Sequence, residues 1–196
     1  NLSAGDFLVY AIMQFDRAKT DSPIYDVSYV PQFEAFMSHF KGVVFNFTPG
    51  SGYDLVVTTY DDMYNLDAEL IARGNSWFPT GSSVSGLNLG PWIWHNLALG
   101  ILAERDGKLA FSQSKATIIH SEWLSFIAGP SLAILNAYLA NVTTLGNPDY
   151  RFLPYSNVVG PYVSNATIDA RYQNLKNWYG NYSNFWVGTG PYYLKS

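Results

Sequence analysis

The chain has 196 residues, of which 48% are hydrophobic, 17% aromatic and 13% charged. This length suits one domain with a buried core, and the low charged fraction excludes a long coiled coil and most kinds of disorder. Eleven basic and fifteen acidic residues give a formal net charge of −4 without any Lys/Arg run, so we expect no nucleic-acid partner. No apolar stretch reaches the ~20 residues of a membrane span. The chain has no cysteine, which excludes disulfides, thiolate zinc sites and a cysteine nucleophile.

Two helices are predicted in the first 42 residues. Ser3 and Asp6 have the spacing of a capping box, and apolar residues follow at helical intervals up to Phe15. A turn is expected at 21–23, where Asp, Ser and Pro are consecutive. Pro31 favours the start of a second helix that carries a stripe of four apolar residues and ends at Gly42. The stripe consists of Phe33, Phe36, Met37 and Phe40.

A β-hairpin is predicted next. Its strands are 43–47 and 55–60, and the segment 49–52 supplies the Pro, Gly and Ser residues of a turn. A short helix is expected at 67–73, followed by a Gly/Ser-rich loop at 80–90 that we interpret as an insertion.

The second half is predicted to be mostly helical. The expected helices are 91–104, 112–120, 122–128 and 130–145, and then a last helix that begins at Asn165 or Thr167. Leu132, Leu135, Leu139 and Val142 are expected inward on the fourth of these, and Ile168, Tyr172, Leu175 and Trp178 on the last. Strands at 185–187 and 192–194 close the chain. The predicted class is α+β, with a small mixed sheet or hairpins packed against several helices.

The residues offer little support for catalysis. His39, His95 and His120 are far apart, and none has a second His at the spacing of a metal face. A hydrolase that uses His95 with Glu104 is the only enzyme hypothesis, and the acidic pair at 61–62 reads as a solvated turn. No phosphate, dinucleotide or nucleophile motif is present. We therefore predict no enzyme activity, no metal and no cofactor.

Aromatic residues are the first positive signal. Flat rings bind sugars or peptides at low entropic cost, and aromatic clusters surround Trp77, Trp92 and Trp94. Because Trp92 and Trp94 are two residues apart at a helix start, both cannot face the same core. These two are the candidate ligand-binding residues, and a carbohydrate-binding module is the alternative function.

Sequons are the second signal. Five Asn residues fit the pattern N-x-[ST]: Asn1, Asn46, Asn141, Asn165 and Asn181. Asn141 lies near a predicted helix end, so the glycosylation candidates are Asn46, Asn165 and Asn181. Together with the low charge, they favour an exported protein in an exposed, acidic environment.

The end of the chain carries a recognisable motif. The segment 185–195 includes Gly188, Thr189, Gly190, Pro191 and Tyr192, and it resembles the "GTGPY" segment of family 5 extracellular solute-binding proteins of ABC importers. Residues 2–10 look like that family's "TAeDvvys" helix. Further segments look like archaeal members: 21–26, 60–72, 110–112, 122–124 and 171–179. The sequence departs from the family at Gly5, where an acid or similar polar residue is usual, and at Thr189, where many archaeal relatives have Asn.

The resemblance implies a piece of a larger two-lobed receptor. Residues 1–196 would form the subdomain inserted in the first lobe of a type II periplasmic-binding-protein-like fold, with 185–196 as the returning strand. The partners implied are the remainder of the receptor chain, ABC permease subunits and a peptide that the full-length protein binds. The protein would be extracellular and anchored to the membrane through other parts of the chain, and its two ends would lie close together. No ligand residues can be transferred from the family.

Overall fold

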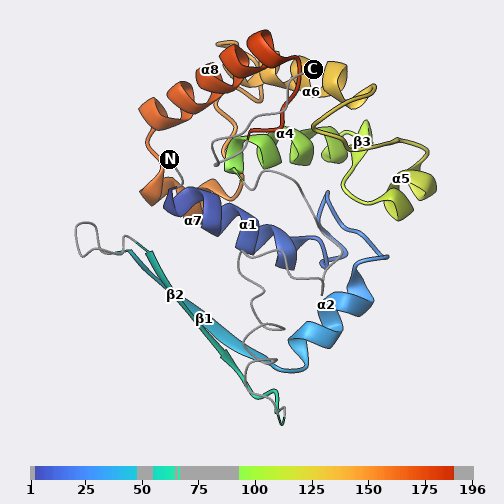
Figure 1. Ribbon diagram of the computed structural model, residues 1–196, viewed down its shortest axis with the longest axis vertical. Helices are drawn as coiled ribbons and strands as arrows, with labels where there is room; N and C mark the ends of the chain where they lie inside the picture. Colours follow the sequence, from blue (N-terminus) through green and yellow to red (C-terminus); the bar gives the residue numbers. More distant parts are fainter. Residues whose placement is uncertain (1–2, 48–54, 65, 67–92, 188–196) are drawn as a thin grey trace.

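The computed structural model describes residues 3–47, 55–64, 66 and 93–187 (Figure 1). Within them the fold is α+β, as predicted. Helix α4 (Trp94–Arg105) lies between α1 (Ala4–Asp16) and the pair formed by α6 (Ser131–Thr143) and α8 (Asn165–Tyr182). A hairpin of β1 (Phe40–Phe47) and β2 (Leu55–Asp61) lies apart from α6 and α8, at the lower left of Figure 1.

Helix α1 begins as the sequence predicts. Ser3 is its N-cap, and the backbone N–H of Ser3 donates to Oδ2 of Asp6 at 2.6 Å. This is the reach-back bond of a capping box. The predicted turn at 21–23 is confirmed by the bond from the Ser22 N–H to the Lys19 carbonyl, at 3.1 Å.

The second predicted helix ends earlier than expected. Helix α2 (Val30–Met37) has Pro31 in its first turn, but Phe40 and Gly42 belong to β1. Phe40 pairs with Asp61 and Gly42 with Tyr60 across the hairpin. Because β-sheet pairing satisfies the backbone of both strands, it outweighs the helical spacing of the Phe residues.

The predicted hairpin is confirmed, with antiparallel strands and Val44 opposite Thr58. Successive side chains alternate between its two faces. Phe45 and Phe47 face inward and pack against the core, and the Phe47 ring lies 4.8 Å from the ring of Tyr162. Val44 and Val56 face outward and are exposed.

Helix α4 is the centre of the core. Every residue from Trp94 to Glu104 is buried, because α1, α6 and β3 (Leu109–Ala110) contact the helix from different sides. At Gly100 a Cβ atom would stand 2.5 Å from the Phe111 ring. Only a glycine therefore lets the ring approach this closely.

The segment after α4 contains one confirmed helix and one error. Ser112 caps α5 (Gln113–Ile119) by accepting the Lys115 N–H at 3.1 Å, as predicted. The helix predicted at 122–128 is wrong, because Glu122 and Trp123 form β4 (Glu122–Trp123), parallel to β3. The backbone of this segment bonds across to Ala110 instead of along a helix, so sheet pairing overrides its local preference.

The C-terminal helices hold their predicted inward residues. Leu135, Leu139 and Val142 of α6 are buried, whereas Leu132 is only partly buried. Ile168, Tyr172 and Leu175 of α8 are buried, and Trp178 is half-buried. Between them lie α7 (Ser156–Val159) and the short 3-10 helix η1 (Gly160–Tyr162). The cap of α8 is Ser164, one residue before the earlier predicted candidate.

The strand predicted at 185–187 is wrong. The Phe185 N–H donates to the Phe126 carbonyl, and its carbonyl accepts from Nδ2 of Asn96, both at 2.7 Å. The backbone of Phe185 therefore bonds to a loop carbonyl and to a side chain, and not to a neighbouring strand. The Phe185 ring is buried and stacks on Tyr179. The predictions for 49–52, 67–73, 80–90 and 188–196 lie outside the described residues.

Candidate functional site

The two Trp candidates have different outcomes. Trp94 is fully buried at the start of α4, and its ring meets that of Tyr172 edge-on at 5.5 Å. A ring without exposed surface has no face for a sugar or a peptide, so Trp94 is a core residue and its prediction as a binding residue is wrong. Trp77 and Trp92 lie outside the described residues.

The His95–Glu104 pair does not exist as a catalytic pair. Nine residues of helix separate them by about 13 Å, and both side chains are buried. Burial, and secondarily the nearby positive charge of Arg171, lowers the pKa of His95 to about 3. His95 is therefore a neutral core residue.

The other two histidines also have structural roles. The Nδ1 of His39 lies 3.1 Å from Asp62, on the exposed end of the hairpin. His120 ends α5 in the left-handed conformation. In the described part of the chain, no group of three or more His or acidic side chains could hold a metal ion.

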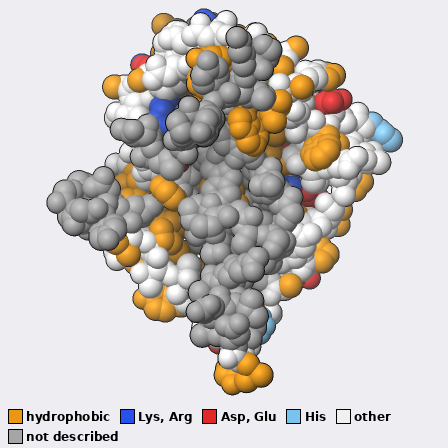
Figure 2. All heavy atoms as spheres, in the orientation of Figure 1, with side chains coloured by type: hydrophobic (Ala, Val, Ile, Leu, Met, Phe, Trp, Pro, Cys, Tyr) orange, Lys and Arg blue, Asp and Glu red, His pale blue; other side chains and the backbone are white. Residues whose placement is uncertain are grey.

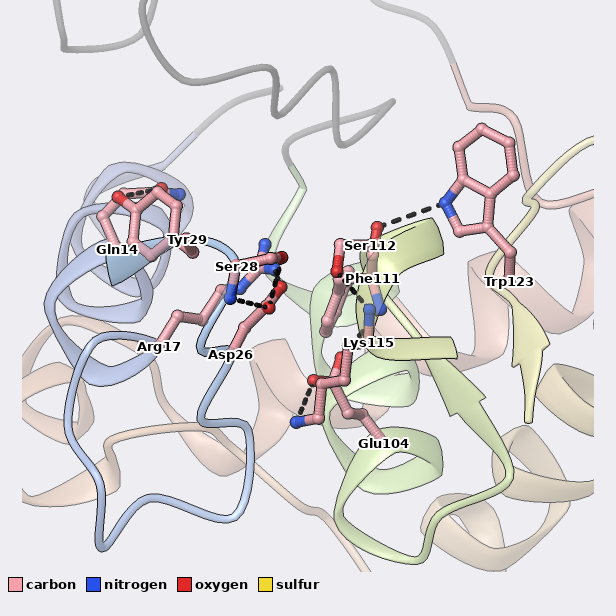
Figure 3. A network of polar contacts seen from close by, with 10 residues as sticks. All are labelled: Gln14, Arg17, Asp26, Ser28, Tyr29, Glu104, Phe111, Ser112, Lys115 and Trp123. Carbon is pink, nitrogen blue, oxygen red and sulfur yellow. Dashed lines mark hydrogen bonds and ion pairs between the residues drawn. The ribbon is translucent and has the colours of Figure 1, made fainter. Parts of the chain in front are cut away.

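A buried polar network joins four parts of the fold, and the sequence did not indicate it (Figure 3). Its ionic centre is Arg17, at the end of α1, whose Nη2 lies 2.5 Å from Oδ2 of Asp26. Both side chains are fully buried. The Asp26 Oδ1 also accepts from the hydroxyl of Ser28 at 2.6 Å. Burial opposes ionisation of Asp26, but the Ser112 and Ser28 hydroxyls and Arg17 together hold its pKa below the usual range.

The second ionic pair of this network lies on α4 and α5. Lys115 forms an ion pair with the buried carboxylate of Glu104, which also accepts the Phe111 N–H at 2.8 Å. Burial raises the pKa of Glu104 against the opposing effects of Arg17 and Lys115. The network thus holds two positive and two negative side chains, and it fixes α1 and the following loop against α4 and α5.

Three nitrogen atoms on one face of α1 are buried hydrogen-bond donors without a partner among the residues that the structure describes. They are Nε2 of Gln14 and Nε and Nη1 of Arg17. The Arg17 guanidinium also lies over the rings of Tyr29 and Phe111, at 5.2 and 5.6 Å from their centroids. Donors of this kind fit a buried water or another oxygen acceptor.

Asp6 connects the starts of α1 and α4 to α8. Its Oδ1 accepts the Trp94 N–H at 2.9 Å, and its Oδ2 accepts from Ser3 and from Nη2 of Arg171, the latter at 3.1 Å. A carboxylate at two helix N-termini compensates the exposed N–H groups of both.

An open groove with a volume of about 450 Å³ lies beside α6 and α8. Tyr150, Asp169 and Gln173 contribute to its lining. Asp169 is engaged by an ion pair with Arg151, so it is not a free anionic group for a ligand. Exposed Trp123, which sequence analysis did not single out, is the most exposed tryptophan of the described residues, at 54%.

The three glycosylation candidates are accessible. Asn46 on β1, Asn165 at the start of α8 and Asn181 near its end are all exposed. Asn141, set aside because of its helical context, is only partly exposed in α6. A sequon is glycosylated on the protein surface, and these three Asn residues meet that requirement.

Comparisons of the chain with family models, with curated proteins and with solved structures found no match. Within the described residues, the helices lack the combination of length and apolar character that a bilayer span requires. Function must therefore be argued from the residues and their contacts.

Proposed function

We propose that this chain is part of an extracellular substrate-binding protein of an ABC importer that takes up oligopeptides. The observation that carries the proposal is that segments resembling the solute-binding family contact one another in the fold. Contacts between these segments are what is expected if they belong to one inherited unit.

The first contact joins the first segment of the resemblance to a late one. Asp6 lies in the first segment and Arg171 in the segment 171–179, 165 residues later, and their side chains pair at 3.1 Å. Arg171 also donates to Oγ of Ser3, at 3.3 Å.

The second contact joins two internal segments, 110–112 and 122–124. The Leu124 N–H donates to the Ala110 carbonyl at 2.9 Å, and Nε1 of Trp123 donates to the Phe111 carbonyl at 3.3 Å. Ala110 of the first segment is also the partner of Trp123 of the second in the parallel pair β3–β4. Every one of these bonds lies between segments that carry the resemblance.

The proposed role of this part is structural support for the receptor. The buried charges of the polar network are paired with one another. In the groove beside α8, Asp169 is paired with Arg151 and so offers no free carboxylate to a ligand. Peptide contacts would come mainly from the two lobes of the full receptor. The ABC permease subunits would be its partners at the cell surface.

Deletion of the gene in the native host tests this proposal. Uptake of a radiolabelled oligopeptide mixture should fall and should return when the gene is restored, while uptake of free amino acids serves as the matched control. Unchanged oligopeptide uptake in the deletion strain would overturn the proposal.

A further inference from the structure

One face of the hairpin exposes several apolar side chains. The register places Val44, Asn46, Val56, Thr58 and Tyr60 on the same side, because Val44 lies opposite Thr58, Asn46 opposite Val56, and Tyr60 opposite Gly42. We call these five residues the outer hairpin face. Val44, Val56 and Tyr60 are 43%, 48% and 53% exposed. Hydrophobic side chains reach the surface over the hairpin, at the lower left of Figure 2.

The charged residues of the two hairpin strands, Lys41 and Asp61, lie at the open end of the hairpin, away from Val44 and Val56. Natural proteins place charged side chains or Pro on such strands to prevent association with other chains. None of the five residues is charged or Pro. The opposite face cannot compensate, because Phe45 and Phe47 on that side pack against the core. The outer face therefore needs a cover that its own side chains do not provide.

The structure places a sequon within this face. Asn46 is exposed on β1, directly opposite Val56 and two residues from Val44. Residues two apart on a strand point to the same side. A sugar attached to the Asn46 amide would thus start between two exposed valines.

We propose that Asn46 carries an N-linked glycan that covers the outer hairpin face. In the reaction, Nδ2 of Asn46 forms a bond to the anomeric carbon of a lipid-phosphate-linked oligosaccharide. The bond from that carbon to the phosphate oxygen breaks, the lipid phosphate leaves with the electron pair, and the amide nitrogen releases one proton. The glycan is bulky and solubilising, so it replaces the charged residues that this face lacks.

The inference rests on the proposed function for its exported location, where the oligosaccharide donor is found. Its test is glycopeptide mass spectrometry of the protein purified from its native host. The peptide with Asn46 should carry the sugar, and variants N46Q and T48A should lose it, whereas T48S should keep it because Ser also completes the sequon. Peptide uptake, measured on the same strains, reports on the proposed function separately.

The covering role has its own readout. Relative to the wild type, N46Q should bind several-fold more of a dye that reports exposed apolar surface, and it should self-associate in sedimentation experiments. Adding V44K to N46Q should reverse both effects, because a charge then protects the face. The matched control N181Q removes a sequon from the end of α8, away from the hairpin, and should change neither.

Three results would overturn the inference, two of them its assignment of a glycan to Asn46 and one its covering role. An unmodified Asn46 in protein that carries sugar at Asn165 or Asn181 would refute the assignment while leaving an exported receptor intact. Absence of sugar from all three residues would refute it as well. If Asn46 is glycosylated but N46Q neither binds more dye nor associates, the covering role is wrong.

Discussion

Asp6 shows how a single side chain organises this fold. Its carboxylate is almost fully buried and accepts from Ser3, from the Trp94 backbone and from Arg171. Replacing one member of such a group leaves the others buried and unsatisfied, which costs more than the loss of an exposed pair.

We therefore expect Asp6→Ala to lower the free energy of unfolding by about 3 kcal/mol. Denaturant titrations followed by tryptophan fluorescence measure this change. The matched control is Asp169→Ala, which removes a carboxylate from the exposed pair with Arg151 and should have a much smaller effect. Equal losses in the two variants would show that Asp6 does not connect the helices as described.

Because His95 is buried, we expect the free energy of unfolding to decrease in acid. Burial lowers its pKa from 6.5 to about 3, so the unfolded chain binds a proton at pH values where the folded chain does not. This contribution to stability is complete above about pH 6.5 and falls as the pH decreases toward 3. The expected slope is up to about 1.4 kcal/mol per pH unit in that range.

The comparison of wild type with His95→Gln isolates this contribution, because Gln does not titrate. Free energies of unfolding are measured between pH 7 and pH 4. The values below about pH 6.5 test the predicted slope. The wild type should lose more stability than the variant as the pH falls. Parallel curves for the two proteins would contradict the low pKa of His95.

The elements of the fold depend on close approaches that sequence patterns do not reveal. Gly100 of α4 faces Phe111, and an added Cβ would stand 2.5 and 2.9 Å from two ring atoms. At Gly180 of α8, by contrast, an added Cβ would meet no atom of the described residues within 4 Å, apart from its chain neighbours and the backbone of its own helix. These two helical glycines form a matched pair.

Gly100→Ala should destabilise the protein by roughly 1–3 kcal/mol, because the methyl group overpacks the core. Gly180→Ala should stabilise it by up to about 1 kcal/mol, because Ala loses less backbone entropy in a helix. Urea midpoints of the two variants measure both changes. Destabilisation by Gly180→Ala, or no effect of Gly100→Ala, would contradict the packing at these positions.

Local signals predicted elements that are stabilised locally. The capping box at Ser3, the Ser112 cap and the hairpin all depend on residues close in sequence. The helix predicted at 122–128 and the strand at 185–187 failed because no local turn joins them to their partners: α5 separates Ala110 from β4, and Asn96 lies 89 residues before Phe185. Periodicity carries no information about such partners.

The candidate site was less predictable than the fold. Trp94 is of a residue type that often binds ligands, but it lies in the core. No pattern in the sequence indicated the Arg17–Asp26 pair. A buried ion pair depends on how helices and loops meet, which the order of residues does not specify. Exposure of Asn46, in contrast, followed from strand alternation once the register was known.

At the scale of the whole molecule, separate segments form one connected body. Residues near both ends of the described chain meet at the Asp6–Arg171 pair, and the polar network joins α1 to α4 and α5. We therefore expect the 196-residue chain to fold by itself. Under the proposed function it should not bind peptides, because the proposed receptor would hold its ligand mainly with its two lobes.

Calorimetric titration with a random oligopeptide mixture tests this central claim most directly. The full-length protein encoded by the gene should bind with micromolar affinity, and the 196-residue chain, shown to be folded by circular dichroism, should release no binding heat. Micromolar binding by the 196-residue chain alone would contradict the supporting role assigned to it. No binding by the full-length protein would contradict its assignment as a peptide receptor.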